Sequence, residues 1–297
     1  MKKILLTGAS GFLGGNFCDL NANQFEIHAI HNDHPTQNKN VISHKAGITD
    51  SGVLEECFHS IKPDILIHLA AYSDPNKCEL HPDISEKINI GASENLALLC
   101  KEAKIPMLFS STDLVFDGKS APYKESDIPT SVNIYGLHKS IAEQAILDIY
   151  PDATICRLPL MFGADFGDKP NYLINILKKL SSNEQINLFT DEYRSIASAR
   201  DVCIGLISCF EHPGQTFHLG GDERISRYEF GIMVCDVFES DKNLLVKSKQ
   251  KDVKMPAARP KDVSMNNDKA KSIGWKPGSI KDELEAVKKA MDRKEVI

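Results

Sequence analysis

The glycine-rich segment TGASGFLGG, residues 7–15, is the strongest indication of the fold in this sequence. It follows a short apolar run, Ile4–Leu6, and opens a segment of helical character, so that a glycine-rich turn joins a strand to a helix. In such a turn Gly8 permits the tight bend, Gly11 lets the backbone approach a pyrophosphate, and Gly14 lets helix and strand pack closely. The first N–H groups of the helix and its dipole favour phosphate. The stretch therefore predicts a βαβ unit that binds a dinucleotide.

Short apolar runs recur through the first half of the chain, and longer segments of helical periodicity separate them. Strands that alternate with helices predict a parallel sheet covered by helices on both faces. The expected strands include Ile4–Leu6, Ile27–Ile30, Ile65–Leu69, Met107–Phe109 and Thr154–Cys156, and the longest expected helix is Ile84–Ala103. The predicted fold class is therefore α/β, with a Rossmann-type, doubly wound parallel sheet.

The second half of the chain is less regular. A capping box of Ser226 and Glu229 begins one helix. Further helices are expected at residues 171–180, 202–210 and 280–293, short strands at 186–189 and 216–219, and a basic loop at 247–261. Because no flexible linker separates the halves, we expect a smaller C-terminal substrate domain interwoven with the first. The predicted division assigns residues 1–157 and about 194–215 to the dinucleotide-binding domain, and residues 158–193 and 216–297 to the substrate-binding region.

Charge and cysteine usage exclude several classes of function. The formal net charge of −6 argues against binding to nucleic acid or to an anionic membrane surface by bulk attraction. The apolar run after Lys3 is too short for a signal peptide or a membrane span. The eight cysteines form no C-x-x-C pair, which predicts buried thiols in a reducing compartment and no metal site. We therefore expect a cytoplasmic protein.

A candidate catalytic pair lies in IYGLHK, where Tyr135 precedes Lys139 by four residues. This spacing puts both side chains on one face of a helix, although tyrosines on amphipathic helices are mostly packing residues. The strand beginning at Met107 ends in SSTD, which brings a hydroxyl, Thr112, to its carboxyl end. Ligands of open α/β sheets bind at such strand ends. The pair, the hydroxyl and the glycine turn together favour an active site over packing.

The pattern T-G-x-x-G-x-x-G, with HLAAYSDP at residues 68–75, resembles the extended branch of the short-chain dehydrogenase/reductase superfamily. The resemblance implies that Tyr135 protonates a carbonyl oxygen, that Thr112 hydrogen-bonds this oxygen, and that Lys139 holds the ribose and stabilises tyrosinate. Asn89 matches an asparagine that supports a proton-relay water, the alternative being a local hydrogen bond. Because free tyrosine has a pKa near 10, action near pH 7 requires a pKa lowered by about three, or roughly 4 kcal/mol.

The same resemblance implies a nicotinamide dinucleotide and the residues that contact it. An acidic residue at the end of the second strand would favour NAD, whereas this strand ends at His31, with Asp33 two residues on. We therefore favour NADP(H) and leave NAD(H) possible. The implied cofactor contacts are Gly8, Ser10, Gly11, Phe12, Leu13, Gly14, His31, Ile48, Leu69, Ala70, Ala71, Tyr72, Ser110, Tyr135, Lys139, Pro159, Leu160 and Met161.

Within the extended branch, several segments are similar to the dTDP-4-dehydrorhamnose reductase family. They are STDLVFDGKSAPYKESD, YGLHK, RLPLMFG, AARP and the terminal GWKP. The resemblance implies reduction of the 4-keto group of a nucleotide-activated 6-deoxysugar. A dehydratase is disfavoured because Asp113 is followed by Leu114, which cannot transfer a proton, where that class has Glu.

The substrate side is expected to include Ser73, Asp113, Val115, Arg194 and Arg259. A guanidinium suits a substrate diphosphate, so the two arginines are candidates for that contact, with ordinary surface ion pairs as the alternative. Residues 190–202, TDEYRSIASARDV, lack the D-Q-x-G-x-P-T pattern of the reductases. This departure leaves the particular sugar open.

Two other functions share these patterns. One is an NAD-dependent nucleotide-sugar epimerase, which regenerates its cofactor in each cycle. The other is a non-catalytic NADP-binding subunit that resembles the regulatory subunit of methionine adenosyltransferase. Members of the branch often pair through two helices, here residues 84–103 and 131–150, so a homodimer is expected.

Overall fold

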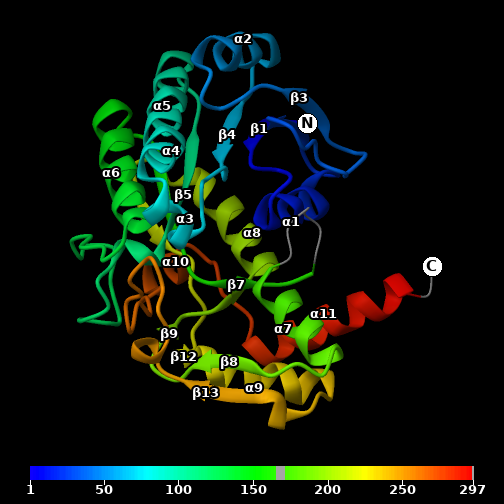
Figure 1. Ribbon diagram of the computed structural model, residues 1–297. Coiled ribbons are helices and arrows are strands. Elements are labelled where there is room, and N and C mark those ends of the chain that lie inside the picture. The colour runs from blue at the N-terminus through cyan, green and yellow to red at the C-terminus, as the bar shows by residue number, and fades with distance from the viewer. Residues whose placement is uncertain (165–170, 296–297) are drawn as a thin grey trace.

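The computed structural model describes residues 1–164 and 171–295, and its centre is a seven-stranded sheet whose neighbouring strands all run parallel (Figure 1). The strand order is β11-β6-β5-β4-β1-β2-β3. The strands are β1 (Lys3–Thr7), β2 (Glu26–His31), β3 (Ile42–Lys45), β4 (Ile65–His68), β5 (Met107–Thr112), β6 (Thr154–Leu158) and β11 (Thr216–His218). The predicted Rossmann-type sheet is therefore confirmed. β11, which we expected in the substrate-binding region, belongs to this sheet because it pairs with β6.

Helices cover both faces of the sheet because successive strand residues point to opposite sides. Ile4 and Leu6 of β1 face one cluster, with Phe17 of α1 (Phe12–Asn21) and Val202 of α8 (Ala199–Ser208). Leu5 faces the other, formed with α2 (Ser51–Ile61), α5 (Ala92–Ala103) and α6 (Ile134–Ile149). Strands β4, β5 and β6 are buried along their whole length, as expected where helices cover both faces of a sheet.

The helix expected at 84–103 is longer and less regular than predicted. It begins at Pro82, in α4 (Pro82–Glu86), and passes through a π-helical segment, η1 (Lys87–Gly91), before α5. Proline is tolerated in the first helical turn, where its missing N–H leaves no bond unmade. Asn89 lies in the π-helical segment, a feature frequent at functional sites. A short helix, α3 (Pro75–Leu80), precedes this run.

The C-terminal region has its own core and three two-stranded sheets. These sheets pair β7 (Met161–Phe162) with β10 (Ala197–Ser198), β9 (Tyr193–Arg194) with β12 (Ile225–Ser226), and β8 (Ile186–Phe189) with β13 (Leu245–Ser248). Its helices are α7 (Tyr172–Ser181), α9 (Arg227–Phe238), α10 (Asp268–Ser272) and α11 (Ile280–Glu295). Single 3₁₀ turns lie at Asp113–Val115, Cys209–Glu211, Lys242–Leu244 and Gln250–Asp252. The predicted capping box of α9 is confirmed.

Two expected boundaries were wrong. The loop expected from residue 247 begins two residues later, at Lys249, because β13 continues to Ser248 by pairing with β8. The helix expected from residue 202 begins at Ala199, because the Ser198 side chain accepts a hydrogen bond from Asp201 N and caps it there. Among residues 1–164 and 171–295, no helix is both long and apolar enough to cross a membrane. All eight cysteines are free thiols, and all but Cys57 are buried.

Candidate active site

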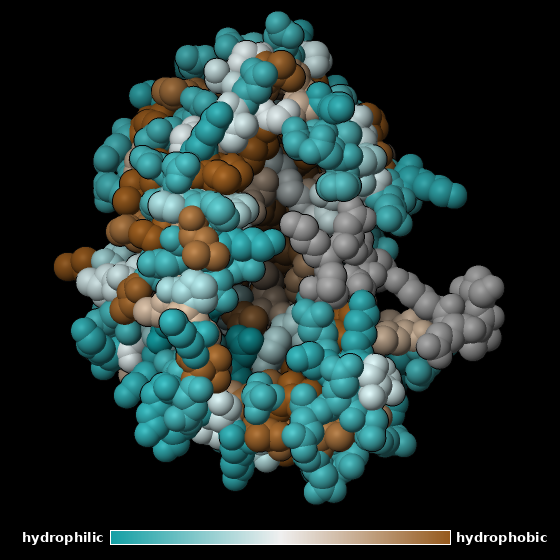
Figure 2. All heavy atoms as spheres, viewed as in Figure 1, coloured by the Kyte–Doolittle hydropathy of each residue, from teal (hydrophilic) through white to brown (hydrophobic). Residues whose placement is uncertain are grey.

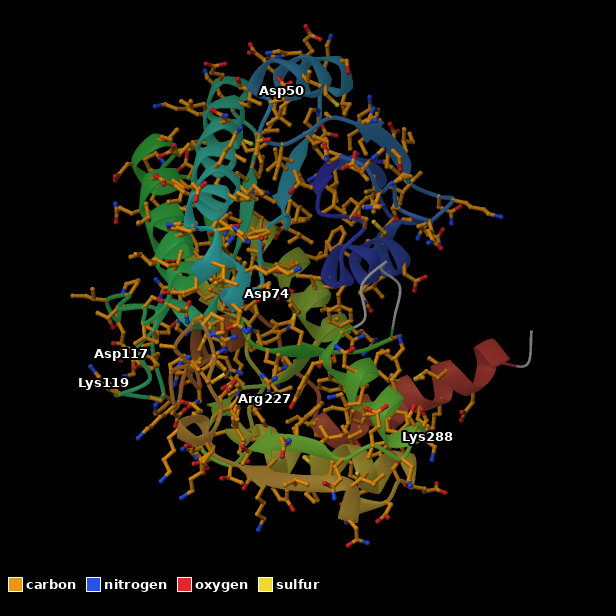
Figure 3. All side chains as sticks on the ribbon, in the orientation of Figure 1. Asp50, Asp74, Asp117, Lys119, Arg227 and Lys288 are labelled. Atoms are coloured by element: carbon orange, nitrogen blue, oxygen red, sulfur yellow. The ribbon has the colours of Figure 1, made fainter. Side chains whose placement is uncertain are left out.

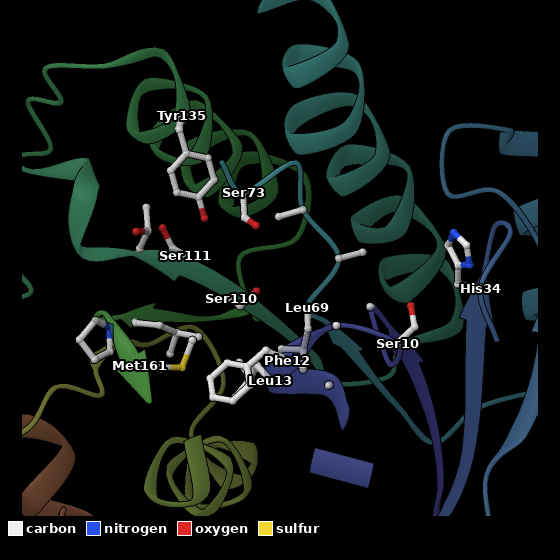
Figure 4. Close-up of a pocket in the computed structure, with 18 residues that line it drawn as sticks. Ser10, Phe12, Leu13, His34, Leu69, Ser73, Ser110, Ser111, Tyr135 and Met161 are labelled. Atoms are coloured by element: carbon white, nitrogen blue, oxygen red, sulfur yellow. The ribbon is translucent and has the colours of Figure 1, made fainter. Parts of the chain in front are cut away.

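A cavity of about 520 Å³ opens where β1, β4 and β5 end (Figure 4). Its walls bring together most of the residues that the sequence predicted for the cofactor and the reaction. The predicted residues on the walls are Gly8, Ser10, Gly11, Phe12, Leu13, Gly14, Leu69, Ala70, Ala71, Ser73, Ser110, Thr112, Tyr135, Pro159 and Met161. Three further wall residues were not predicted: His34, Ser111 and Leu158.

The glycine turn has the geometry that a pyrophosphate requires. Gly8 has a φ of +78°, and a Cβ atom there would lie 2.6 Å from Ala70 N. A Cβ atom on Gly14 would lie 2.7 Å from the Cα of Ala9, so the turn and α1 touch backbone to backbone. Within residues 1–164 and 171–295, no side chain caps the start of α1, whose first N–H groups follow Gly11. Only glycine lacks the Cβ atom that would collide with the neighbouring backbone at these positions. The turn can therefore bring its backbone N–H groups close to a dinucleotide phosphate.

Gly14→Ala is expected to weaken coenzyme binding at least tenfold and to lower the free energy of unfolding by about 1–3 kcal/mol, because backbone cannot yield to the added methyl group. Isothermal titration with NADPH and urea unfolding would measure both. Gly52→Ala, at the start of α2, is the matched control, since its Cβ meets no atom closer than 3.8 Å. A Gly14→Ala protein with unchanged stability would contradict the close packing.

The end of β2 differs from the expected arrangement. His31 is half-buried and is not among the cavity walls, and its Nδ1 atom has no hydrogen-bond partner within the described part of the chain. His34, three residues further, lies on the wall and is exposed. Ile48 packs against the core cluster of α2 and α5 and is also absent from the walls. The HNDH stretch contains both histidines, His31 and His34. A strand end predicted from sequence is uncertain by a few residues, so the sequence could not show which of the two lies on the cavity wall.

Tyr135 and Thr112 meet at the junction of β5 and α6. The Asn133 side chain accepts a hydrogen bond from Gly136 N and caps α6 just before Tyr135. Burial, reinforced by Cys78 and the Asp113 carboxylate, raises the pKa of the Tyr135 phenol well above its usual 10, against a lowering effect of the Thr112 hydroxyl. The lowered pKa that we expected is therefore wrong for the protein alone, because desolvation favours the neutral phenol. Tyr135 is thus a protonated hydroxyl, ready to donate.

Lys139 is 1% exposed and lies one helical turn after Tyr135 on α6. Burial lowers the pKa of its ammonium group from 10.5 to about 7, although the Glu143 carboxylate opposes this shift. Its Nζ atom is 3.8 Å from the centroid of the Phe109 ring. Glu143 is held by Arg157, whose Nη2 and Nε donate to it at 2.8 and 3.1 Å. Near pH 7 the charge of Lys139 therefore depends on what binds beside it.

Asn89 makes the local hydrogen bonds that were the alternative to a relay role. Its Oδ1 accepts from Tyr72 N at 2.9 Å, and its Nδ2 donates to Tyr72 O and to Ser85 Oγ, both at 3.1 Å. Ser85 in turn lies 2.9 Å from Nδ1 of His138. Tyr72 is not among the cavity walls, but its backbone is fixed by these bonds, which hold the wall segment from Leu69 to Ser73. A relay role for Asn89 stays a prediction.

The substrate side contains buried ion pairs rather than surface arginines. Arg194 is 3% exposed and donates to Glu192 at 3.0 Å and to Asp113 at 3.4 Å. Arg227, in the C-terminal region of Figure 3, also pairs with Glu192, at 3.3 Å. Burial raises the pKa of Asp113, although Arg194 opposes the rise. The alternative that we left open for Arg194, an ordinary ion pair on the surface, is excluded because its side chain is buried.

Three other predicted residues lie outside the cavity walls. Arg259 is half-buried and donates to Ala257 O at 3.1 Å and to Asn76 Oδ1 at 3.0 Å. Val115 lies in a small core with Phe116 and Tyr123. Leu160 packs against the core of the C-terminal region. Diphosphate contacts of Arg194 and Arg259 stay predictions.

Comparisons with known proteins agree with this arrangement. The family described as RmlD substrate binding domain matches residues 1–293. A probable low-salt glycan biosynthesis reductase of Haloferax volcanii is 30% identical over 292 residues, which cover 96% of this chain and 97% of that protein. The methionine adenosyltransferase 2 subunit beta of Rattus norvegicus is 26% identical over 290 residues, which cover 92% of this chain and 83% of that protein.

Two solved structures superpose closely. One is a dTDP-4-dehydrorhamnose reductase of Bacillus anthracis in complex with NADP, with a TM-score of 0.86 and 23% identity over 97% of this chain and 99% of that chain. The other is a hypothetical dTDP-4-dehydrorhamnose reductase of Sulfolobus tokodaii, with a TM-score of 0.83 and 29% identity over 94% of this chain and 98% of that chain. The family match spans nearly the whole chain, and the sheet order and glycine turn agree with it. The chain therefore belongs to the RmlD substrate binding domain family.

Proposed function

We propose that this protein reduces the 4-keto group of a nucleotide-activated 6-deoxysugar with NADPH. The observation that carries the proposal is the cavity that begins at the glycine turn and ends at Thr112 and Tyr135. It brings a phosphate cradle and a protonated phenol to one space. The name of the Haloferax volcanii relative, a glycan biosynthesis reductase, supports the same class of reaction.

The residues of the chain divide the work as follows. A bound nicotinamide coenzyme supplies hydride to the carbonyl carbon. Tyr135 donates its phenolic proton to the carbonyl oxygen, and Thr112 steadies the Tyr135 hydroxyl. Lys139, once anionic coenzyme groups bind beside it, holds a positive charge that stabilises the tyrosinate left behind. Buried surroundings exclude water and strengthen these interactions.

We favour NADPH over NADH because of the residues near the end of β2. His31 ends the strand and His34 lines the cavity, and either imidazole can donate a hydrogen bond to a 2′-phosphate. Asp33, which would suit a 2′-hydroxyl, is exposed and is not among the cavity walls. The solved relatives include complexes with NADP and with NAD, so titration of both coenzymes is the decisive measurement.

The proposal is tested by coenzyme oxidation. The purified protein is incubated with NADPH or NADH and a dTDP-4-keto-6-deoxysugar, and absorbance at the nicotinamide band is followed. Thermal unfolding with NAD, NADP and nucleotide sugars runs in parallel, because a ligand of the native state raises stability by mass action. We expect oxidation of NADPH that depends on the sugar. Tightly copurified NAD without net oxidation would favour the epimerase, and no turnover with a panel of keto sugars would contradict the reductase.

A regulatory subunit is the second candidate. It is favoured by the likeness to methionine adenosyltransferase 2 subunit beta over 92% of this chain and by the ion pairs that engage Arg194. Capture of a stoichiometric methionine adenosyltransferase partner, together with coenzyme binding and no turnover, would support it. The retained Thr112, Tyr135 and Lys139 favour the enzyme.

We also propose a homodimer that pairs through α4, α5 and α6. Apolar side chains are exposed on these helices, at Ile84, Leu98, Leu137 and Ile141, each 42–44% exposed. Figure 2 shows apolar residues on the side of the molecule that these helices form in Figure 1. A second copy would bury this face by helix packing. Sedimentation equilibrium at twice the chain mass of 32.9 kDa would support the dimer, and a monomer would contradict it.

The free thiols support a reducing environment, so a cytoplasmic location belongs to the proposal. Fractionation of cells that express the tagged protein tests it.

A further inference from the structure

His68 is a fully buried histidine that the proposed reaction does not use. It is the last residue of β4 and is 0% exposed. Burial lowers the pKa of its imidazole from 6.5 to about 3, and the nearby Lys139 ammonium group adds to the lowering. The ring is therefore neutral near pH 7. A neutral imidazole has one N–H donor and one acceptor nitrogen, and in a buried position both need partners.

The partners of the imidazole determine which of its nitrogens carries the hydrogen. Ser93 Oγ donates its single hydrogen to Asn89 O at 2.8 Å, so toward His68 it can only accept. Nε2 of His68, which is 3.0 Å from Ser93 Oγ, therefore carries the hydrogen. Nδ1 is left as an acceptor, and Thr7 Oγ1 donates to it at 2.7 Å. Thr7 Oγ1 in turn accepts from Ala70 N at 3.1 Å. The ring thus accepts on the side of β1 and donates on the side of α5.

This chain of hydrogen bonds begins and ends on one segment of the cavity wall, residues 69–73. The segment lies between β4 and α3, and all its residues except Tyr72 line the cavity (Figure 4). At one end the hydroxyl of Thr7 holds Ala70 N. At the other end the Asn89 side chain binds both N and O of Tyr72, at 2.9 and 3.1 Å. The imidazole connects these two attachments, so it braces the wall segment from behind.

The wall segment lies in direct contact with the glycine turn. A Cβ atom on Gly8 would lie 2.6 Å from Ala70 N and 2.8 Å from the carbonyl carbon of Leu69. Thr7 directly precedes Gly8, so the bond from Ala70 N to Thr7 Oγ1 ties the wall to the turn itself. That bond requires the Thr7 hydrogen to point away from Ala70 toward an acceptor, and Nδ1 of His68 is this acceptor. The width of the cavity beside the turn therefore depends on Nδ1.

We infer that His68 is a positioning residue for the nicotinamide coenzyme, because through the Thr7 hydroxyl it holds residues 69–73 against the glycine turn. The inference rests on the coenzyme binding of the proposed function and adds a residue that lies behind the wall. His68 transfers no proton, and its two nitrogens only fix the direction of the surrounding hydrogen bonds. The bond to Thr7 is the one that coenzyme binding requires, whereas the bond to Ser93 anchors the ring on α5.

Two substitutions of His68 separate the two bonds. The amide of His68→Asn reaches the place of Nδ1, so its oxygen accepts from Thr7 while the bond to Ser93 is lost. The amide of His68→Gln reaches the place of Nε2, so it donates to Ser93 while the acceptor for Thr7 is lost. Each variant loses one buried hydrogen bond, so the melting temperature should fall by a similar amount in both. The dissociation constant of NADPH should rise by about tenfold or more in His68→Gln and by less than about threefold in His68→Asn.

Thr7→Val provides a second route to the same result. It keeps the imidazole and removes the hydroxyl between the ring and Ala70 N, so it should weaken NADPH binding as His68→Gln does. Thr154→Val is the matched control, because Thr154 Oγ1 donates to His212 O at 3.1 Å at the start of β6. It should lower the melting temperature and leave NADPH affinity unchanged.

Isothermal titration measures the affinity, with NADH in place of NADPH if the wild type prefers it. Hydrogen exchange of a peptide that spans residues 69–73 should be faster in His68→Gln than in His68→Asn. Equal losses of affinity in these two variants, a loss confined to His68→Asn, or unchanged affinity in Thr7→Val would overturn the inference. The titration needs no turnover, so a wild type that binds coenzyme and reduces no keto sugar contradicts the proposed reduction alone. A wild type that binds neither coenzyme contradicts both.

Discussion

Tyr135→Phe is expected to lower kcat for keto-sugar reduction by about 10²–10⁴-fold, the range that a positioned general acid contributes. The substitution removes one oxygen atom and keeps the ring that packs with Leu114 and Cys78. The substitution removes a buried polar group together with its hydrogen bond to Thr112, and these two effects oppose one another, so the free energy of unfolding should change by less than about 1 kcal/mol. NADPH affinity should stay within about twofold, since the helix and the cavity walls are kept. Stopped-flow turnover and coenzyme titration give the two numbers.

Tyr150→Phe is the matched control for this experiment. Tyr150 follows the other end of α6, and its Oη donates to Ile105 O at 3.2 Å. This substitution removes the same atom from a partly buried tyrosine far from the cavity. It should cost about 1 kcal/mol of stability and no turnover. If Tyr135→Phe keeps the wild-type kcat, Tyr135 is a packing residue and the proposed chemistry is wrong.

The fold was predictable because its signals are local or periodic. The glycine turn, the apolar strands and the Ser226 capping box each depend on a few neighbouring residues, and the structure agrees with all three. The errors concern partners distant in the chain. β11 joins the sheet only through β6, and β13 extends only through β8. The sequence of a strand does not indicate which distant strand it pairs with.

Most of the residues that line the cavity were predictable from the sequence, and their electrostatics were less so. A motif names Tyr135 and Lys139, but the direction of each pKa follows from burial, which the sequence does not contain. The burial of Arg194 was not evident from the sequence because one of its partners, Asp113, lies 81 residues away along the chain.

These electrostatics tie function to stability in the region around α6. The Lys139 ammonium group, the Ser111 hydroxyl and the Tyr135 phenol are all buried, and burial of such polar groups costs folding free energy. Ser111 and Tyr135 line the cavity, and Lys139 supports Tyr135. Arg157 and Glu143 compensate one another in the same layer, where removal of one partner of such a pair typically costs about 3–5 kcal/mol. The buried polar groups of the site therefore destabilise the free protein, and the surrounding structure compensates for them. This is expected where a bound ligand supplies their hydrogen-bond or charge partners.

Lys139→Met is expected to abolish most turnover and to stabilise the free protein. Burial holds the pKa of Lys139 at about 7 in the folded chain, against 10.5 when it is exposed. Between these two pH values the unfolded chain binds more protons than the folded chain, so the stability of the wild type rises as pH increases from about 7 to about 10.5. Below pH 7 the folded protein carries the full cost of the buried charge, at most about 4–5 kcal/mol.

The methionine side chain has a similar length and no charge, so the variant should gain about 2–4 kcal/mol at pH 6 once relaxation around the lysine is allowed for. The gain should shrink with rising pH and disappear near pH 10. Turnover should fall by about 10²-fold or more, because the charge that stabilises tyrosinate is gone. Urea unfolding at several pH values measures the first effect, with Lys178→Met, an exposed lysine on α7, as the control that should show neither. A variant that is less stable than wild type at pH 6 would mean that Lys139 is paired in the folded protein, since only a partner of opposite charge can turn its burial into a net gain.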